Sequence, residues 1–393
     1  MRPLDGRRLW FVGIGGAGLS AYALLAHEWG AAVAGWDRVR TPYLEHLPAA
    51  VEVVIADEPI AAPDGWEVIV STAFAGRVSG KPRAALLAEL VSLRDSIVVA
   101  GAHGKTTTTA MIAFVLREAG RDPSFLVGGE VPQLGGNAGT GKGWLVVEGD
   151  ESDRTVEALR PQIAVVTNVD LDHHTTFASR ADVAQLFDHW LAAAPHVVRG
   201  DTLPPYEGTL AVPGEHNRRN AAAALAALEL AGVAPRDARA ALAGFRGVTR
   251  RLEARGEAGG VRVFDDYGHH PAEVAAALAA LRDSGRLLVL FQPHLYSRTR
   301  HLAREFGAAL AAADIVAVAD VYAAREDPIP GVEGKLVVDA IADVRPGMSV
   351  AWTPDPADGA AYLASRARDG DQILTLGAGD VDRTVALILE ALG

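Results

Sequence analysis

The sequence predicts an α/β protein with mostly parallel sheets, built from three successive segments. Strand-like and helix-like patterns alternate along nearly all of the 393 residues, which is typical of parallel sheets covered by helices. Two glycine loops each follow an apolar strand and precede a helix. The length exceeds that of one ordinary domain and predicts two or three domains.

The composition is that of a globular protein without disulfides. Apolar residues make up 49% of the chain and charged residues 22%, which is sufficient for large buried cores. Cysteine is absent, and this excludes disulfides and thiolate metal ligands. No apolar run is long enough to cross a bilayer, and the N-terminus does not resemble a cleavable signal, so we expect a cytoplasmic protein without a membrane partner. The net charge of −12 argues against a nucleic-acid partner.

The first predicted domain, residues 1–94, carries a glycine loop whose ligand the residues alone leave open. A strand over residues 9–12 leads into Gly13-x-Gly15-x-x-Gly18, and Asp37 follows at the end of the next strand. The spacing fits a dinucleotide site, with pyrophosphate at the helix N-terminus and the carboxylate at a ribose hydroxyl. It also fits the pyrophosphate of a nucleotide sugar. A third interpretation is a glycine turn that only packs the helix on the sheet.

The second predicted domain, residues 95–247, carries a more specific loop. A strand over residues 97–100 runs directly into the loop 101–106 and a helix. Such a loop surrounds phosphates with backbone N–H groups at a helix N-terminus. We therefore expect ATP here, with Lys105 at the β- and γ-phosphates and Thr106 facing Mg²⁺. The loop is a short variant, because Val99 stands where the common pattern has its first glycine.

Polar residues follow the next two strands of this segment. Glu148 directly continues the apolar strand 144–147, and His173 follows the strand 163–167. Because the carboxyl ends of parallel strands meet at one edge of a sheet, we expect both side chains near a metal ion. Further along, Asn217 and Asn220 are three apart and share a helix face. Their amides suit an adenine edge or a helix cap equally well.

The third predicted domain, residues 248–393, places histidines and tyrosines at two strand ends. Residues 265–271 follow the strand 261–264, and residues 292–298 follow the strand 287–291. A surface charge cluster accounts for the preceding Arg250. It does not account for two strand ends that both carry histidine and tyrosine, so we interpret them as parts of a site.

Taken in order, these motifs resemble the Mur ligases of peptidoglycan synthesis. The resemblance rests on the runs at residues 100–109, 265–271, 292–294 and 327–332, and on their order. It implies three domains: an N-terminal Rossmann-like UDP-binding domain, a central P-loop ATPase domain with a mostly parallel sheet, and a C-terminal Rossmann-like domain that contacts ATP and the amino acid. It assigns the first glycine loop to a nucleotide sugar instead of nicotinamide.

The resemblance also implies an activity. The expected reaction joins L-alanine to the lactoyl carboxylate of UDP-N-acetylmuramate, at the expense of ATP, through an acyl phosphate and a tetrahedral intermediate. The expected cofactors are ATP and Mg²⁺, and the expected partners are small-molecule substrates only, for a monomer or weak homodimer.

The implied site residues fall into five groups. The group for the UDP substrate is Gly13, Gly15, Gly16, Ala17, Gly18, Asp37, Ser71 and Thr72. The group for ATP is Gly101, Ala102, His103, Gly104, Lys105, Thr106, Thr107, Asn217, Asn220, Arg251 and Asp266. The amino-acid group is Tyr267, His269, His294 and Arg298, and the metal group is Thr106, Glu148 and His173. The catalytic group is Lys105, Glu148, His173, His269, His270, His294 and Arg298.

Two positions depart from the family pattern. Thr175 stands where the family has an aspartate, and Leu295 stands where many members have an arginine. These departures leave two alternatives open: a paralogue that uses another amino acid or a peptide, and a non-catalytic relative that only binds a nucleotide sugar.

Overall fold

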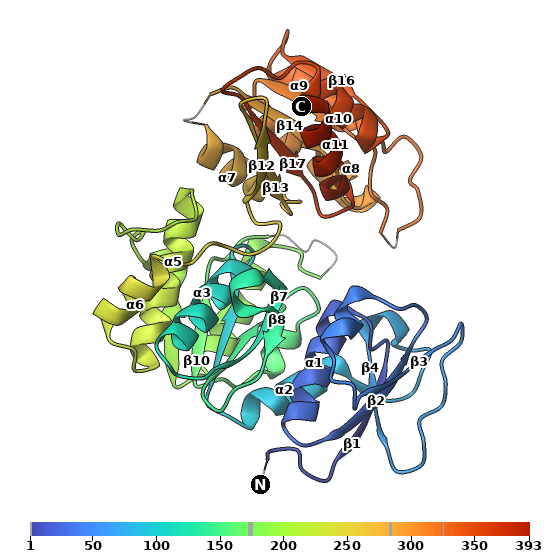
Figure 1. The fold of residues 1–393 in the computed structure, drawn as a ribbon, viewed down its shortest axis with the longest axis vertical. Helices are drawn as coiled ribbons and strands as arrows, with labels where there is room; N and C mark the ends of the chain where they lie inside the picture. Colours follow the sequence, from blue (N-terminus) through green and yellow to red (C-terminus); the bar gives the residue numbers. More distant parts are fainter. Residues whose placement is uncertain (1, 172–175, 283–284, 325) are drawn as a thin grey trace. The chain divides into compact units, whose positions relative to one another are not determined.

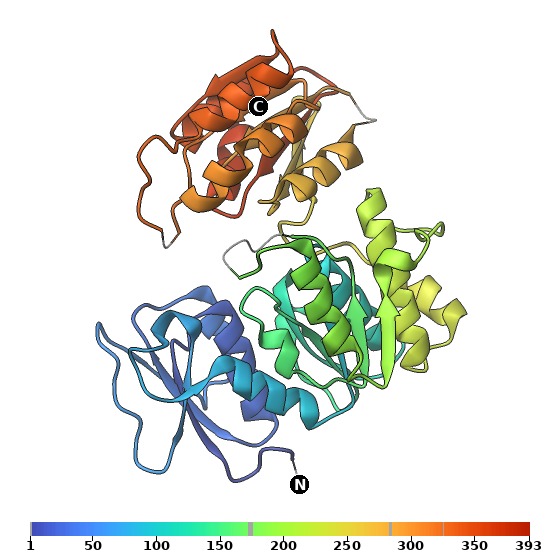
Figure 2. The same ribbon diagram turned by 180° about the vertical axis from the view of Figure 1, so that it is seen from behind.

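The computed structural model describes residues 2–171, 176–282, 285–324 and 326–393. It divides into two compact units, residues 1–211 with 218–248, and residues 212–217 with 249–393. Three sheets are present in the described residues, one in each predicted segment (Figures 1 and 2). The predicted α/β class with mostly parallel sheets is therefore confirmed. The predicted boundaries near residues 94 and 247 stay predictions.

The first sheet is entirely parallel, in the order β3-β2-β1-β4-β5. Its elements are β1 (Arg8–Val12), α1 (Ala17–Glu28), β2 (Ala32–Asp37), η1 (Pro42–His46), β3 (Glu52–Ile55), β4 (Glu67–Val70), η2 (Thr72–Phe74), β5 (Lys81–Pro82) and α2 (Arg83–Ser92). The chain leaves β1 in both directions across the sheet, first to β2 and β3, then to β4. The loops after β1 and β4 therefore form the crevice where ligands bind in such sheets.

The second sheet has the order β11-β10-β6-β9-β7-β8, and only the β7–β8 pair is antiparallel. Its first elements are β6 (Ser96–Ala100), α3 (Lys105–Glu118), β7 (Ser124–Val131), η3 (Pro132–Leu134), β8 (Gly136–Gly139), β9 (Leu145–Glu148), η4 (Thr155–Ala158) and β10 (Ile163–Val166). They are followed by α4 (Arg180–Leu191), β11 (His196–Arg199), η5 (Gly200–Thr202), α5 (Glu215–Leu230) and α6 (Pro235–Leu242). β6 lies between β9 and β10, so the loops after these three strands lie next to one another.

The third sheet has the order β12-β13-β17-β14-β15-β16, with β12 as its antiparallel edge. Its first elements are β12 (Glu253–Ala258), β13 (Val261–Asp266), α7 (Pro271–Leu281), β14 (Leu287–Phe291), α8 (Tyr296–Leu310) and β15 (Ile315–Val318). They are followed by α9 (Lys335–Val344), β16 (Ser349–Trp352), α10 (Pro356–Ala364), β17 (Gln372–Leu376), η6 (Val381–Arg383) and α11 (Thr384–Leu392). Helices α7, α8 and α9 cover one face, which faces the viewer in Figure 2, and α10 and α11 cover the other.

The first two sheets share one hydrophobic core. This core includes Leu25 of α1, Leu87 of α2, Leu126 of β7 and Phe187 of α4. Helix α1 packs on the first sheet with one side and contacts β7 and β8 with another (Figure 1). The continuous core explains why the first two predicted segments form a single compact unit.

No helix in the described ranges is long and apolar enough to span a membrane.

Candidate functional site

The phosphate loop, residues 101–104, connects β6 to the N-terminus of α3 and depends on two glycines. Gly101 has φ +128° and Gly104 has φ +81°, conformations that side chains rarely adopt. A Cβ atom at Gly101 would lie 2.3 Å from Thr167 Oγ1, and one at Gly104 would lie 2.2 Å from Asn220 Oδ1. The loop thus passes too close to its neighbours for a side chain at Gly101 or Gly104, and Asn220 lies against it.

The two residues that follow β10 form hydrogen bonds with the same loop. Thr167 Oγ1 and Asn168 Nδ2 donate to the carbonyl oxygen of His103 at 2.6 and 2.8 Å. His103 N donates in return to Asn168 Oδ1 at 3.0 Å. Both backbone polar groups of His103 are therefore fixed by the two residues that follow β10, and these contacts hold the shape of the loop.

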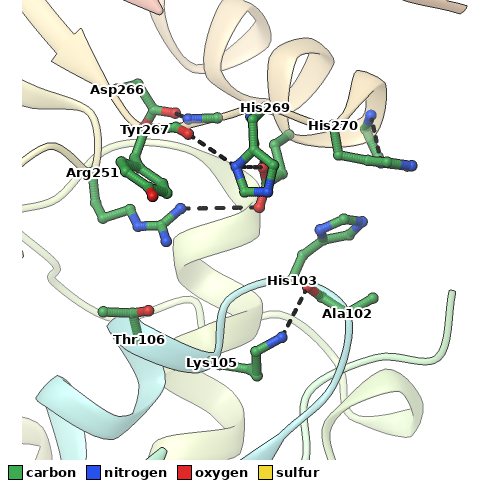
Figure 3. Close-up of polar contacts among 12 residues, drawn as sticks. Ala102, His103, Lys105, Thr106, Arg251, Asp266, Tyr267, His269 and His270 are labelled. Carbon is green, nitrogen blue, oxygen red and sulfur yellow. Dashed lines mark hydrogen bonds and ion pairs between the residues drawn. The ribbon is translucent and has the colours of Figure 1, made fainter. Parts of the chain in front are cut away.

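Lys105 turns back into the loop (Figure 3). Its Nζ donates to the carbonyl oxygen of Gly101 at 2.7 Å and to Glu151 Oε1 at 2.8 Å. The Glu151 side chain is only 2% exposed. Burial disfavours the charged amine, but attraction to Glu151 and the hydrogen bond outweigh it, and the pKa of Lys105 is raised. The lysine is therefore a cation at neutral pH, paired inside the protein.

Thr106 and Glu148 supply oxygen atoms beside the loop. Thr106 Oγ1 donates to Glu148 Oε1 at 3.0 Å, and Gly128 N donates to Glu148 Oε2 at 2.7 Å. A hydroxyl and a carboxylate are the ligand types that Mg²⁺ takes from a protein when phosphate and water complete its coordination. These two residues therefore fit the ion. His173 lies outside the described residues. Among those described, no group of three or more His, Asp or Glu side chains is placed to hold a metal.

The glycine loop of the first sheet brings together most of the residues predicted for it. A Cβ atom at Gly13 would lie 2.6 Å from Ser71 Oγ, so the loops after β1 and β4 touch. Gly15 N donates to Asp37 Oδ2 at 2.7 Å, and Arg38 N donates to Asp37 Oδ1 at 2.7 Å. Asp37 therefore accepts hydrogen bonds from two backbone N–H groups at the crevice, in addition to any contact with a ribose.

The N-terminus of α1 follows this loop, with Gly16, Ala17 and Gly18 in its first turn. No side chain caps the helix, and its first turn holds no acidic residue. The first backbone N–H groups of a helix need a partner from outside the helix, and an anion suits them. Thr72, also predicted for this site, is exposed at the start of η2.

Arg83, the first residue of α2, lies beside the glycine loop and was not predicted from the sequence. A Cβ atom at Gly18 would lie 3.2 Å from Arg83 Nη1. Arg83 Nη2 lies 3.7 Å from Asp150 Oδ2 and 3.6 Å from Asp153 Oδ2. One guanidinium group thus faces both the helix that follows the glycine loop and the acidic turn after β9.

Four rings form a row at the carboxyl end of the third sheet. Tyr267 meets His269 edge-on at 5.5 Å between ring centroids, and His269 meets His294 at 5.9 Å. His294 stacks on Tyr322 at 5.9 Å. Arg298 Nη1 lies 3.3 Å from His294 Nδ1. The four residues predicted for the amino acid therefore lie close together, and Tyr322, which follows β15, joins them; their role stays a prediction.

His294 is uncharged at neutral pH. Burial lowers its pKa to about 4, and the nearby His269 and Arg298 act in the same direction, against Glu326. An arginine only donates hydrogen bonds, so His294 Nδ1 accepts the one from Arg298 and the ring proton sits on Nε2.

Asp266 organises the backbone that leads into this row. Leu252 N donates to Asp266 Oδ2 and Gly268 N to Oδ1, both at 2.7 Å. Burial raises the pKa of Asp266 to about 6, although both hydrogen bonds favour the carboxylate. The neighbouring Arg251 lies over the Tyr267 ring at 5.1 Å (Figure 3). Asp266 therefore positions Arg251 and Tyr267, a role that its place at a strand end did not indicate.

Two predicted residues have capping contacts. His270 Nδ1 accepts a 3.4 Å hydrogen bond from Ala272 N at the start of α7. Asn217 Nδ2 donates to the carbonyl oxygen of Pro213 at 2.7 Å, near the start of α5. Both residues are buried, and both contacts order the start of a helix.

Four residues that contact the predicted groups were not assigned to any of them: Arg83, Glu151, Glu273 and Tyr322. Tyr322 and Glu151 carried a usable signal, because each lies in a polar turn directly after a buried strand. Arg83 and Glu273 are first-turn helix residues, and only the tertiary structure brings them to the sites.

Comparison with known proteins identifies two domains of the chain. Residues 99–194 match the Mur ligase middle domain, and residues 250–379 match the Mur ligase glutamate ligase domain. The UDP-N-acetylmuramate–L-alanine ligase of Renibacterium salmoninarum is 41% identical over 98% of this chain and 96% of its own length. That of Rubrobacter xylanophilus is 39% identical over 98% of this chain and 100% of its own.

A solved structure agrees as well. The UDP-N-acetylmuramate–alanine ligase of Thermotoga maritima is 25% identical, covers 98% of both chains and superposes with a TM-score of 0.79. The match in fold, order of motifs and full-length sequence leads to one conclusion. The chain belongs to the Mur ligase family.

Proposed function

We propose that this chain joins L-alanine to the lactoyl carboxylate of UDP-N-acetylmuramate, with conversion of ATP to ADP and phosphate. The observation that carries the proposal is the phosphate loop held by Thr167 and Asn168, with Lys105 charged and the Thr106–Glu148 pair beside it. Full-length relatives whose names state this reaction support the choice of substrates.

In the first step, a lactoyl carboxylate oxygen attacks the γ-phosphorus of ATP, and the bond from that phosphorus to ADP breaks. The charge of the transferred group spreads over its oxygen atoms, so catalysis consists mainly of positioning and electrostatic stabilisation. The backbone N–H groups of the loop, the N-terminus of α3 and the Lys105 cation provide both. A Mg²⁺ ion held by Thr106 and Glu148 would neutralise phosphate charge.

In the second step, the amine of L-alanine attacks the carbonyl carbon of the acyl phosphate. The tetrahedral intermediate then collapses, its bond to the phosphate oxygen breaks, and phosphate leaves with the electron pair. The ring row Tyr267, His269, His294 and Tyr322, with Arg298, is the place proposed for the amino acid. Its uncharged donor, His294 Nε2, and its cation, Arg298, suit the carboxylate of an amino acid.

The UDP part of the substrate belongs at the glycine loop of the first sheet. The uncapped N-terminus of α1 and the nearby Arg83 suit a pyrophosphate. The mechanism uses no nicotinamide. Partners are small molecules, and the reaction needs no membrane.

The test combines purified protein, MgATP, UDP-N-acetylmuramate and each amino acid singly, with detection of released phosphate and of the product mass. We expect release that depends on both co-substrates, is greatest with L-alanine and is lost in Lys105→Ala. Lys142→Ala, at an exposed lysine of the same sheet region, is the matched control and should leave the rate unchanged. Release with another amine or a peptide would indicate a paralogue, and no release with any combination would overturn the proposal.

A further inference from the structure

Two neighbouring histidines of the ring row, His269 and His294, carry their protons on opposite nitrogens. The carbonyl oxygen of Tyr267 lies 3.2 Å from His269 Nδ1. A carbonyl oxygen only accepts, so the hydrogen of the neutral ring sits on Nδ1 and the lone pair on Nε2. His294 has the reverse arrangement, because the guanidinium of Arg298 donates to its Nδ1. The row thus offers one basic nitrogen and one donor.

Glu273 supports this arrangement at His269 from the first turn of α7. Its Oε2 accepts a 2.9 Å hydrogen bond from His269 N and lies 3.5 Å from His269 Nδ1. Its Oε1 lies 3.9 Å from Arg251 Nη1. The Glu273 side chain is 15% exposed, so its charge is poorly screened by water. Figure 3 shows the contact between His269 and the carbonyl oxygen of Tyr267 as a dashed line.

The rings on either side fix the plane of His269. Tyr267 contacts it edge-on, with an angle of 83° between the planes, and His294 does so at 63°. Arg250 and Arg251 lie over the Tyr267 ring at 5.2 and 5.1 Å. The Tyr267 carbonyl oxygen accepts from one ring nitrogen, the Glu273 carboxylate lies 3.5 Å from the same nitrogen, and the ring is held from both sides. Together these contacts orient His269 for the role of a general base.

We propose that Glu273 and His269 form a dyad that takes a proton from the ammonium group of the incoming amino acid. The proposal rests on the proposed function, because the substrate amine arrives protonated and cannot attack in that form. The N–H bond breaks, its proton moves to His269 Nε2, and the electron pair stays on nitrogen to form the bond to the acyl carbon. His269 is then an imidazolium, which the Glu273 carboxylate stabilises, and it returns its proton to water. The second surplus N–H proton leaves to water as the amide forms.

His294 does not compete for this role. Its Nε2 carries the ring proton, so it acts as a hydrogen-bond donor. Glu273 is a positioning residue, since it acts through His269, and His269 is the catalytic residue of the pair.

The test uses two nucleophiles that differ in one respect. L-alanine must lose a proton before it attacks, whereas hydroxylamine is uncharged at neutral pH and attacks an acyl phosphate directly, giving a hydroxamate. We expect His269→Gln to lower kcat with L-alanine roughly 100-fold or more, and Glu273→Gln to lower it in the same direction by a smaller factor. Hydroxamate formation with MgATP, UDP-N-acetylmuramate and hydroxylamine should stay at the wild-type rate, because the first step is intact.

The controls separate the dyad from a structural effect. Glu257→Gln removes an exposed carboxylate from β12 in the same compact unit and should change neither rate. An equal loss with both nucleophiles, or an unchanged rate with L-alanine, would overturn the dyad. If circular dichroism shows that Glu273→Gln does not fold, His269→Gln decides by the same comparison. A wild-type protein that makes neither product would instead overturn the proposed function, and the dyad with it.

Discussion

Glu151 accepts a 2.8 Å hydrogen bond from Nζ of Lys105, the phosphate-loop lysine. The carboxylate is buried, and the lysine also donates to the carbonyl oxygen of Gly101. The loop therefore holds its cation neutralised by an internal anion. In the proposed function, phosphate oxygens of ATP would take over part of the role that Glu151 fills, so we expect Glu151 to affect how strongly the loop attracts nucleotide.

Replacement of Glu151 by glutamine should lower the stability of the folded protein and raise its affinity for ATP. A glutamine oxygen still accepts from Lys105, but the buried ammonium loses its charge partner, which costs about 1–3 kcal/mol. The lysine is then more available to phosphate. We expect a lower melting temperature without nucleotide and a larger rise on addition of MgATP than in the wild type. An unchanged rise would show that Glu151 does not compete with phosphate.

Gly101→Ala should disrupt ATP binding far more than an alanine at a comparable glycine. The new Cβ atom would lie 2.3 Å from Thr167 Oγ1 at a φ of +128°, so the loop must shift. We expect the Kd for an ATP analogue, measured by calorimetry, to rise roughly tenfold or more, which corresponds to about 1.4 kcal/mol. Gly120→Ala is the control, because Gly120 has φ +68° and no atom within 4 Å of the added Cβ. An equal rise in Kd in both variants would show that the unusual φ angle, and not the contact with Thr167, causes the loss of binding.

His294 should titrate far below an ordinary histidine. Its pKa is lowered to about 4 by burial and by the nearby His269 and Arg298. Because the folded state binds the proton more weakly than the unfolded chain, the contribution of His294 to stability is complete above about pH 6.5 and is lost as the pH falls toward 4. We expect the histidine Cε1 proton signal that disappears in His294→Gln to titrate near pH 4. A midpoint at or above 6.5 would contradict the buried, uncharged ring.

Arg83→Gln should weaken binding of the nucleotide sugar. Its guanidinium lies against the first turn of α1 and is held by Asp150 and Asp153 only at 3.6–3.7 Å, too far for hydrogen bonds. A phosphate would replace these weak pairs with bidentate contacts. We expect the Kd for UDP and for UDP-N-acetylmuramate to rise together. Arg8→Gln, at an exposed arginine of β1, should leave both unchanged, and a loss confined to UDP-N-acetylmuramate would place Arg83 at the sugar acid instead.

The sequence was sufficient for the central strands and the loops that follow them. Buried strands such as β6 and β14 read as continuous apolar runs, and glycine or polar residues mark their ends. The strands that sequence reasoning omitted were β3, β5, β7, β8, β11 and β12. Most of these strands lie at sheet edges, where one side of the strand faces solvent and the apolar pattern is weaker. Their pairing depends on the sheet beside them, which local sequence does not encode.

The site was predictable in its members but less so in their roles. Lys105, Thr106 and Glu148 followed from the loop and the strand order, and the structure places them together. Asp266 was predicted to face a ligand, yet both of its oxygens hold backbone N–H groups. Such contacts arise from the path of a distant loop around Leu252, which no spacing rule describes.

Of the two positions that depart from the family pattern, the structure describes only Leu295. Thr175 lies outside the described residues. Leu295 has φ +69° at the start of α8, an unusual conformation for leucine, and its N–H donates to the carbonyl oxygen of Tyr322 at 3.0 Å. Local strain of this kind often occurs at functional sites. Here Leu295 directly follows His294 and bonds Tyr322, which are two members of the ring row.

Helix α1 links the glycine loop of the first sheet to the β7–β8 hairpin of the second sheet. Its first turn follows the glycine loop, its side contacts β7 and β8, and Gly128 of β7 donates to Glu148. Asn137 of β8 also donates to the carbonyl oxygen of Ala17 at 3.2 Å. A substitution on this side of α1 would be offset most easily by one on the β7–β8 hairpin. The first two sheets are thus expected to change together in evolution. Replacing one of them with the corresponding sheet of a distant relative would require compensating substitutions in the other.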